Sequence, residues 1–201
     1  MENAVPYPSG RVRNLQSQTR TQLNALLSRR QQIEWPVLYG STFDFTTMKQ
    51  RACRAPELHD AEAWIHSEPL TLDDLKGKVV IVHFYTYICI NCVRNLPHYN
   101  RWHADFPADR LQIIGIHRPE FQHDRQLAKI EQAAKEAGIT YPIAVDNASK
   151  NWDTWGNQVW PSVYLIDKQG FIRYWWYGEL NWQGTPGEQQ MRHRIQALLA
   201  E

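Results

Sequence analysis

The segment from Val79 to Thr86, VVIVHFYT, constrains the fold most, because a β-branched and aromatic run of this length is typical of a strand buried on both faces. It leads directly into a Cys-x-x-Cys pair formed by Cys89 and Cys92. From Cys92 onward, apolar residues recur every three or four positions as far as Phe106. The sequence therefore predicts a buried strand that passes straight into a helix, with both cysteines at the junction.

The segments that follow alternate between predicted strands and helices. Leu111 to His117 has the pattern of a second strand, and the helix after it is closed by Gly138. A strand, a helix and a second strand in this order imply a parallel pair with a right-handed crossover. The remaining elements are a short extended piece at Tyr141 to Val145, a helical turn at Ser149 to Trp155, an antiparallel hairpin of Ser162 to Ile166 with Phe171 to Tyr177, and a last helix from Pro186 to Ala200.

The segment ahead of the first buried strand, Ala63 to Lys78, reads AWIHSEPLTLDDLKGK. Its pattern indicates two short strands around a turn at Ser67 to Pro69, which would form an N-terminal β-hairpin. Together these elements predict an α/β fold. It has a mixed central sheet flanked by helices, the N-terminal hairpin, and an inserted helix plus short strand.

Residues 1–50 differ in composition from the rest of the chain. No acidic residue occurs between Asn3 and Ile33, whereas five arginines give that segment a charge of +5. Its leucines recur at near-helical spacing among Gln and Arg residues. We therefore divide the chain into a basic N-terminal extension, 1–50, expected to be helical or partly disordered, and a folded domain, 51–201.

Composition excludes several classes of function. The 22 basic and 21 acidic residues nearly cancel, which argues against nucleic acid as a partner. No stretch approaches the roughly 20 apolar residues of a membrane span, and the first 30 residues lack the apolar core of a secretion signal. Three cysteines are too few for the disulfide framework of a small secreted protein. We expect a cytoplasmic protein whose cysteine chemistry is dynamic.

The position of the cysteine pair at a strand-to-helix junction predicts different chemistry for the two thiols. Cys89 would lie at the helix N-terminus, where unpaired N–H groups and the helix dipole stabilise a thiolate. Cys92 would lie one turn further on, more buried, on the same side of the helix. Cys89 would then attack a substrate disulfide, and Cys92 would resolve the mixed disulfide and leave a Cys89–Cys92 bridge.

Two other readings of the pair stay open on the residues alone. A zinc site normally needs four Cys or His ligands; Cys53 is the one further cysteine of the chain, and His98 could supply a fourth ligand. His98 is six residues past Cys92, which would point it away from the pair. The other reading is two inert buried thiols. Cys53 itself fits an unremarkable or structural thiol.

Beyond the pair, several motifs resemble one family in both order and spacing. They are AWIHSEPLTLDDLKGKVVIVHFYTYICINCVRNLP, IIGIHRPEF, GITYPIAVDNASKNWDTWGNQVWPSVYLIDKQGFIRY and YGELNW. With them the chain resembles the thioredoxin-like superfamily, in particular the TlpA/ResA-type branch. Within that branch it is similar to the thioredoxin-like domains of DipZ-type thiol reductases and of NHL-repeat-containing proteins. The resemblance covers about Pro56 to Glu201 and implies a thioredoxin fold.

Residue by residue, the resemblance assigns roles to four positions. Cys89 matches the exposed nucleophile of the family and Cys92 its resolving thiol, so we expect a redox-active Cys89–Cys92 disulfide and no cofactor. Pro97 matches the proline that kinks the active-site helix. Pro161 matches the cis-proline loop that contacts substrate backbone. Trp160, which precedes it in that loop, is assigned to substrate binding with it.

The chain also departs from the family pattern. Thioredoxin carries a buried acid six residues before the first cysteine, and this chain has His83 there. His83 and Glu120, in HRPEF, are therefore both candidates for proton transfer, against the alternatives of a core histidine and a plain loop carboxylate. The residues between the cysteines, Ile90 and Asn91, replace the Gly-Pro of thioredoxin, so the reduction potential cannot be carried over.

The expected function is a thiol-disulfide oxidoreductase that reduces protein disulfides. Its partners would be a disulfide-containing protein and an upstream electron donor, and we expect a monomer. Because many relatives are exported, the alternative location is extracytoplasmic, as part of a longer chain. The alternative function is a non-catalytic binding module that holds a peptide beside Cys89 and Pro161, which exposed Trp175 and Trp176 would suit. A thiol peroxidase is a weaker candidate, since it does not need an adjacent resolving cysteine.

Overall fold

The computed structural model describes residues 18, 21–22, 25–28, 31 and 53–201. The chain divides into two compact units, 1–51 and 52–201. In the first unit, residues 18, 21–22, 25–26 and 31 are helical. Residues 27–28 are not helical, and the other residues of the predicted N-terminal extension lie outside the described residues.

The second unit is built on a mixed sheet whose strand order is β1-β7-β6-β3-β4-β5-β2. The central strand β3 pairs in parallel with β4 and antiparallel with β6. The strands are β1 (Cys53–Arg54), β2 (Ala63–Ile65), β3 (Val79–Tyr85), β4 (Leu111–His117), β5 (Ile143–Val145), β6 (Ser162–Ile166) and β7 (Phe171–Tyr177). The helices are α3 (Ile90–Asp105), α4 (Leu127–Glu136), α5 (Lys150–Thr154) and α6 (Gly187–Ala200), with short 3₁₀ turns η2 (Gln122–Arg125) and η3 (Trp182–Gly184).

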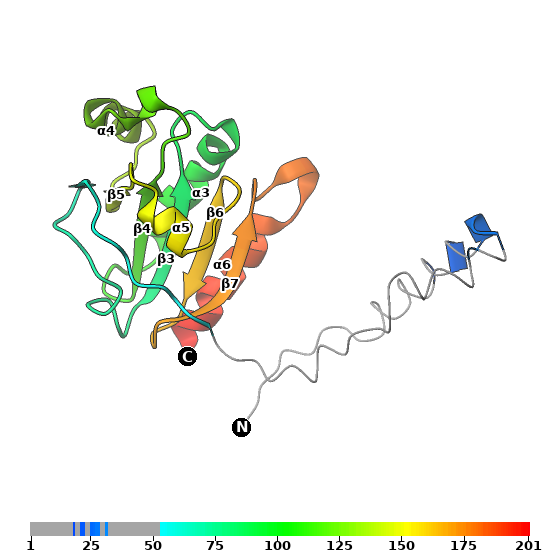
Figure 1. The fold of residues 1–201 in the computed structure, drawn as a ribbon. Helices are drawn as coiled ribbons and strands as arrows, with labels where there is room; N and C mark the ends of the chain where they lie inside the picture. The colour runs from blue at the N-terminus through cyan, green and yellow to red at the C-terminus, as the bar shows by residue number, and fades with distance from the viewer. Residues whose placement is uncertain (1–17, 19–20, 23–24, 29–30, 32–52) are drawn as a thin grey trace. The chain divides into compact units, whose positions relative to one another are not determined.

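Alternation along the strands divides the core into two layers. All residues of β3 are buried, but Val79 and Ile81 belong to one cluster, whereas Val80 and Val82 belong to the other. The first layer packs against α3, α4 and α6, and the second against α5 and the segment 55–75. Figure 1 shows α3 and α6 on one face of the sheet and α5 on the other. This two-sided burial explains why β3 reads as a continuous apolar run.

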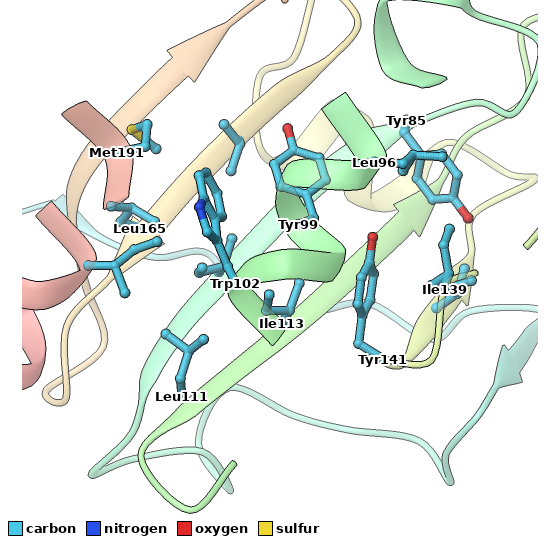
Figure 2. Packing of buried hydrophobic residues seen from close by; sticks show 14 of the residues in the cluster. Tyr85, Leu96, Tyr99, Trp102, Leu111, Ile113, Ile139, Tyr141, Leu165 and Met191 are labelled. Atoms are coloured by element: carbon cyan, nitrogen blue, oxygen red, sulfur yellow. The ribbon is translucent and has the colours of Figure 1, made fainter. Parts of the chain in front are cut away.

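The first layer contains the largest buried side chains. Tyr99 and Trp102 extend from α3 among residues of the sheet and of α6, including Leu165 and Met191 (Figure 2). Both rings are fully buried. Their spacing of seven and ten residues from Cys92 places them on the same face of the helix, which holds the second half of α3 against the sheet.

The predicted strands and helices from Val79 to the C-terminus are confirmed, including the inserted helix α4 and the short strand β5. The predicted N-terminal hairpin is wrong. Its first strand, β2, pairs antiparallel with β5, with Ala63 opposite Val145. Its second strand is absent, because the segment forms turns in which the Thr71 hydroxyl and the Asp74 carboxylate hydrogen-bond each other locally, and such local bonds compete with strand pairing.

The two adjacent tryptophans of β7 are not equally exposed. Trp175 is 59% exposed, as expected, but Trp176 is half-buried and packs against the first layer. Successive residues of a strand point to opposite faces, so the prediction of two exposed tryptophans was wrong for Trp176.

Candidate active site

Cys89 is the N-cap of α3, at the end of the loop that leaves β3. Its backbone is extended, with φ −76° and ψ 112°, and its carbonyl accepts the first helical hydrogen bond, from the Val93 N–H at 3.0 Å. The first turn of α3 contains no acidic side chain. No carboxylate of that turn therefore competes with the Cys89 sulfur for the positive end of the helix dipole.

The surroundings of the Cys89 sulfur favour its anionic form. A hydrogen bond from the Cys92 thiol, together with the backbone N–H groups of Cys92 and Asn91, lowers the pKa of Cys89 to about 6. Partial burial and the negative charge of Glu120 oppose this change without cancelling it. At neutral pH the half-buried Cys89 is therefore mostly a thiolate, which is the nucleophilic form of cysteine.

Cys92 is in the opposite state. It is fully buried on the inner face of α3, and this burial is the main reason that its pKa is raised far above the usual range. Its hydrogen bond to Cys89 raises the pKa further, and the Thr86 backbone N–H lowers it only in part. All three cysteines of the chain carry free thiols. The pair thus combines an accessible thiolate with a protonated thiol one helical turn away.

Pro161 lies at the same edge of the sheet as the cysteines. Ser162 of β6 pairs antiparallel with Phe84 of β3, and this register carries Pro161 to the level of Tyr85, four residues before Cys89. The Trp160–Pro161 peptide bond is cis, and the Pro161 carbonyl accepts a hydrogen bond from the Gly178 N–H at 2.8 Å. The half-buried Trp160 packs on Trp152, with ring centroids 4.3 Å apart.

The rim around Cys89 exposes apolar side chains. Ile90 is 59% exposed and Val93 is 40% exposed, both in the first turn of α3. Val159, two residues before Pro161, is 46% exposed. These residues present an apolar border to any chain that approaches the Cys89 sulfur.

His83 is enclosed in the layer behind the cysteines. Its ring is fully buried, its Nε2 hydrogen-bonds the Tyr141 hydroxyl at 3.0 Å, and the Tyr99 ring lies 4.3 Å away between centroids. Burial lowers the pKa of His83 to about 3, so the imidazole is neutral at physiological pH. The cluster also includes Tyr85, whose ring centroid is 5.1 Å from that of His83.

Gly115 of β4 makes room for the His83 ring. A Cβ atom at this position would lie 3.0 Å from His83 Nε2 and 3.2 Å from Tyr85 Cε1. Gly115 is directly opposite His83 in the parallel pairing of the two strands. The histidine and this glycine are therefore sterically matched.

Glu120 lies on the exposed loop after β4. Its negative charge is among the causes that raise the pKa of both cysteines. Glu120 is thus near the pair electrostatically and accessible to solvent, whereas His83 is behind it and enclosed.

Two buried residues near the site escaped the sequence analysis. His117, the last residue of β4, is fully buried, and its ring stacks on Tyr87 with centroids 5.4 Å apart. Burial lowers its pKa to about 4, although the charge of buried Asp124 opposes this. Both ring nitrogens lack a hydrogen-bond partner among the described residues. The available signal was a histidine at the end of a strand, within the HRPEF motif.

Asn95, one turn after Cys92, was also missed. It is fully buried, accepts a hydrogen bond from the Leu180 N–H at 2.9 Å and donates one to the Gly178 carbonyl at 3.1 Å. These bonds tie the cysteine helix to the segment after β7, which also carries the bond to Pro161. A polar residue on the buried face of a predicted helix was the signal that pointed to it.

The described residues contain no group of three or more His, Cys, Asp or Glu side chains suited to hold a metal ion. His98 lies beside Asn181, with His98 Nε2 and Asn181 Nδ2 3.3 Å apart. Within the same residues, no helix is long and apolar enough to cross a membrane.

A family model described as the AhpC/TSA family matches residues 52–175. The thiol-disulfide oxidoreductase YkuV of Bacillus subtilis is 31% identical over 147 residues, which cover 73% of this chain and 94% of YkuV. The protein DipZ of Mycobacterium tuberculosis is 37% identical over 134 residues. That alignment covers 65% of this chain but only 19% of DipZ.

Solved structures agree with these matches. The crystal structure of a protein described as belonging to the thioredoxin-like superfamily is 28% identical and superimposes with a TM-score of 0.67. The superposition covers 75% of this chain and 98% of that one. The mixed sheet with helices on both faces is thus the thioredoxin-like fold that the motifs implied.

Proposed function

The chain belongs to the AhpC/TSA family of thioredoxin-like proteins, and from this premise we propose that it reduces protein disulfides through a Cys89/Cys92 dithiol. The observation that carries the proposal is the contrast within the pair. Cys89 has a pKa lowered to about 6 at the accessible N-terminus of α3, whereas the neighbouring Cys92 is buried with a raised pKa. This division of roles is what a nucleophile and a resolving thiol require.

In the first step, the Cys89 thiolate attacks one sulfur of a substrate disulfide. The substrate S–S bond breaks as the Cys89–substrate bond forms, and the second substrate sulfur leaves as a thiolate that takes a proton from water. The N–H groups at the start of α3 stabilise the thiolate before the attack. The product of this step is a mixed disulfide.

In the second step, Cys92 attacks the Cys89 sulfur. The Cys92 proton must be lost, and the first substrate sulfur leaves as a thiolate, so that two electrons pass to the substrate and a Cys89–Cys92 disulfide remains. In the mixed disulfide Cys89 no longer carries a negative charge. The contribution of that charge to the raised pKa of Cys92 therefore disappears when deprotonation is needed.

We assign the acceptance of the Cys92 proton to Glu120 rather than to His83. The charge of Glu120 acts on both sulfurs, and its carboxylate is exposed, so it can exchange protons with water. His83 is enclosed and bonded to Tyr141, and a pKa of about 3 makes it a weak base. We assign His83 to the packing behind the pair.

Trp160 and Pro161 form the peptide-binding side of the proposed site. The register of β6 on β3 supports this, because it brings Pro161 to the sheet edge that carries the cysteines. The exposed Ile90, Val93 and Val159 would cover the apolar side chains that flank a substrate disulfide. An unidentified dithiol donor would then reduce the Cys89–Cys92 bridge.

A second candidate function, a binding module without turnover, is favoured by the same apolar rim. The exposed apolar side chains of Ile90, Val93 and Val159 could contact a peptide whether or not electrons are transferred. Redox titration followed by mass spectrometry separates the two functions. A pair that stays reduced across physiological potentials supports the module.

The experiment that tests the proposed reductase uses insulin as the disulfide substrate and dithiothreitol as the electron source. Cys89→Ser should abolish the protein-dependent rate. Reduced Cys92→Ser protein, mixed with insulin after the dithiothreitol has been removed, should accumulate a mixed disulfide on Cys89 that mass spectrometry identifies. Cys53→Ser, which removes the exposed third thiol, is the matched control and should keep the full rate. Unchanged insulin reduction in both Cys89→Ser and Cys92→Ser would rule the proposal out.

A further inference from the structure

Arg118, directly after β4, joins three segments that are far apart in the sequence. Its backbone N–H donates to the Tyr85 carbonyl at 3.0 Å, so its main chain is anchored where β3 ends. Its side-chain Nε donates to the Ser149 hydroxyl at 3.0 Å, at the start of α5. Its guanidinium lies over the ring of Trp160, 4.8 Å from the centroid.

The same guanidinium also covers Trp152 of α5, 5.1 Å from that ring centroid. Because the two indoles are themselves 4.3 Å apart, Arg118, Trp152 and Trp160 form one compact stack. A planar guanidinium over an aromatic face is a favourable arrangement that an ammonium group reproduces only in part. In the part of the chain that the structure describes, Arg118 has no carboxylate partner, so the two rings and Ser149 hold its head group.

Trp160 is held in place by packing and not by a hydrogen bond from its indole. Its indole N–H is buried and has no hydrogen-bond acceptor among the described residues. A tryptophan placed by a hydrogen bond would keep its position when a ring neighbour is removed. Trp160 instead contacts Trp152 and Arg118 and packs against both core clusters, and it is covalently joined to Pro161.

The support for the stack is itself rigid. The buried Asp146 carboxylate accepts hydrogen bonds from the Asn151 and Trp152 N–H groups, at 3.2 and 2.9 Å, which fixes the start of α5 and hence Trp152. Ser149 has a left-handed backbone, with φ 61°, which is costly for a residue other than glycine. Its hydroxyl makes no capping bond to the helix and instead receives Arg118.

We propose that Arg118 is a positioning residue for the peptide-binding loop: through its stack on Trp160 it sets the position of the Trp160–Pro161 segment that receives the substrate. The inference rests on the proposed function of that loop. Arg118 acts through Trp160, and the reacting sulfurs are served by other groups, since no charge of Arg118 is among those that shift the pKa of either cysteine.

The test measures KM and kcat for insulin reduction in Arg118→Met, Arg118→Lys and Ser149→Ala. Arg118→Met should raise KM by about five- to thirtyfold, with a smaller change in kcat, because a cation–π contact and one hydrogen bond are lost. Arg118→Lys should not restore KM, since lysine keeps the charge but loses the planar stack. Ser149→Ala should raise KM by a smaller factor.

Arg194→Met is the matched control. Arg194 of α6 lies outside the site, and its guanidinium carbon is 4.5 Å from the ring centroid of Tyr174. It should leave KM unchanged. In a Trp160→Leu background, Arg118→Met should change KM by less than about twofold if Arg118 acts through Trp160. A full effect of Arg118→Met in that background, or full rescue by Arg118→Lys, would overturn the proposal.

Insulin affinity of a Cys89→Ser/Cys92→Ser protein separates this proposal from the proposed reductase. Wild-type protein that fails to reduce insulin refutes the reductase, yet the Cys89→Ser/Cys92→Ser protein should still bind insulin more weakly once Arg118→Met is added. Equal binding with and without Arg118→Met overturns the positioning role. The pH midpoint of Cys89 alkylation should not move in Arg118→Met, which shows that the reacting sulfur is unaffected.

Discussion

Cys89 at the mouth of the site and His83 in the layer behind it both have a lowered pKa, and the two changes have opposite effects on charge. For Cys89 the change favours the thiolate, because a hydrogen bond from Cys92 and backbone N–H groups face the sulfur. For His83 it favours the neutral ring, because no group compensates the loss of water. The molecule thus holds a charge where a substrate can reach it and excludes charge one layer further in.

The difference shows why a shifted pKa alone does not identify a catalytic group. Cys89 belongs to the cysteine pair, His83 lies in the layer behind it, and the pKa of each departs from its ordinary value. Only Cys89 combines the change with solvent access and a position at a helix N-terminus. His83 combines it with three tyrosine rings and full burial, which is the environment of a structural residue.

The largest expected effect is the contrast in reactivity between the two active-site thiols. In a Cys53→Ser background, iodoacetamide should modify Cys89 at least about 100-fold faster than Cys92 at pH 7. The thiolate fraction of Cys89 is lost as pH falls through its lowered pKa. The rate of Cys89 alkylation should therefore rise with pH around a midpoint of about 6. Peptide mapping by mass spectrometry measures both rates. An alkylation midpoint of Cys89 near the ordinary pKa of cysteine would contradict a stabilised thiolate at this position.

The next effect concerns the layer behind the pair. His83→Ala should lower the free energy of unfolding by about 2–4 kcal/mol, because it leaves a cavity among the tyrosine rings and removes the partner of the Tyr141 hydroxyl. Urea denaturation measures this change. The Cys89 alkylation midpoint should stay in place. If His83→Ala instead kept full stability and moved that midpoint by a whole pH unit, His83 would act on the Cys89 thiolate and not only on packing.

A smaller loss of stability is expected for Gly115→Ala. The added Cβ would press on His83 Nε2 and Tyr85 Cε1, which we expect to cost about 1–3 kcal/mol. The double variant with His83→Ala is the control, since removing the ring should relieve most of that loss in urea denaturation. Fully additive losses would show that the glycine and the histidine are not sterically coupled.

The smallest expected effect concerns the charge of Glu120 near Cys89. Glu120→Gln removes a negative charge that raises the pKa of Cys89, so the Cys89 alkylation midpoint should fall by a few tenths of a pH unit. Glu131→Gln, on the exposed side of α4, is the matched control and should leave the midpoint in place. Added salt should shrink the effect of Glu120→Gln. An upward shift of the midpoint would contradict the assigned electrostatics.

Much of the fold was predictable because its signals are local. Each of these signals involves residues that are close together in the sequence. Examples are the apolar run of β3, the three- and four-residue spacing of α3 and the turn between β6 and β7. The N-terminal hairpin was mispredicted because the partner of β2 is β5, about 80 residues further along the chain. The exposure of Trp176 was mispredicted because burial depends on which face of β7 meets α6.

The amino-acid sequence by itself determined the cysteine pair and its position between a buried strand and a helix. Both follow from residue type, spacing and hydrophobic period, which need no knowledge of distant contacts. The expectation that Pro161 faces the pair came from the family resemblance. Only the tertiary structure decided that His83 is enclosed by tyrosines from three elements, that Gly115 makes room for it, and that Arg118 stacks on Trp152 and Trp160. Burial, charge state and ring stacking arise from segments that meet only when the sheet assembles, so no local pattern encodes them.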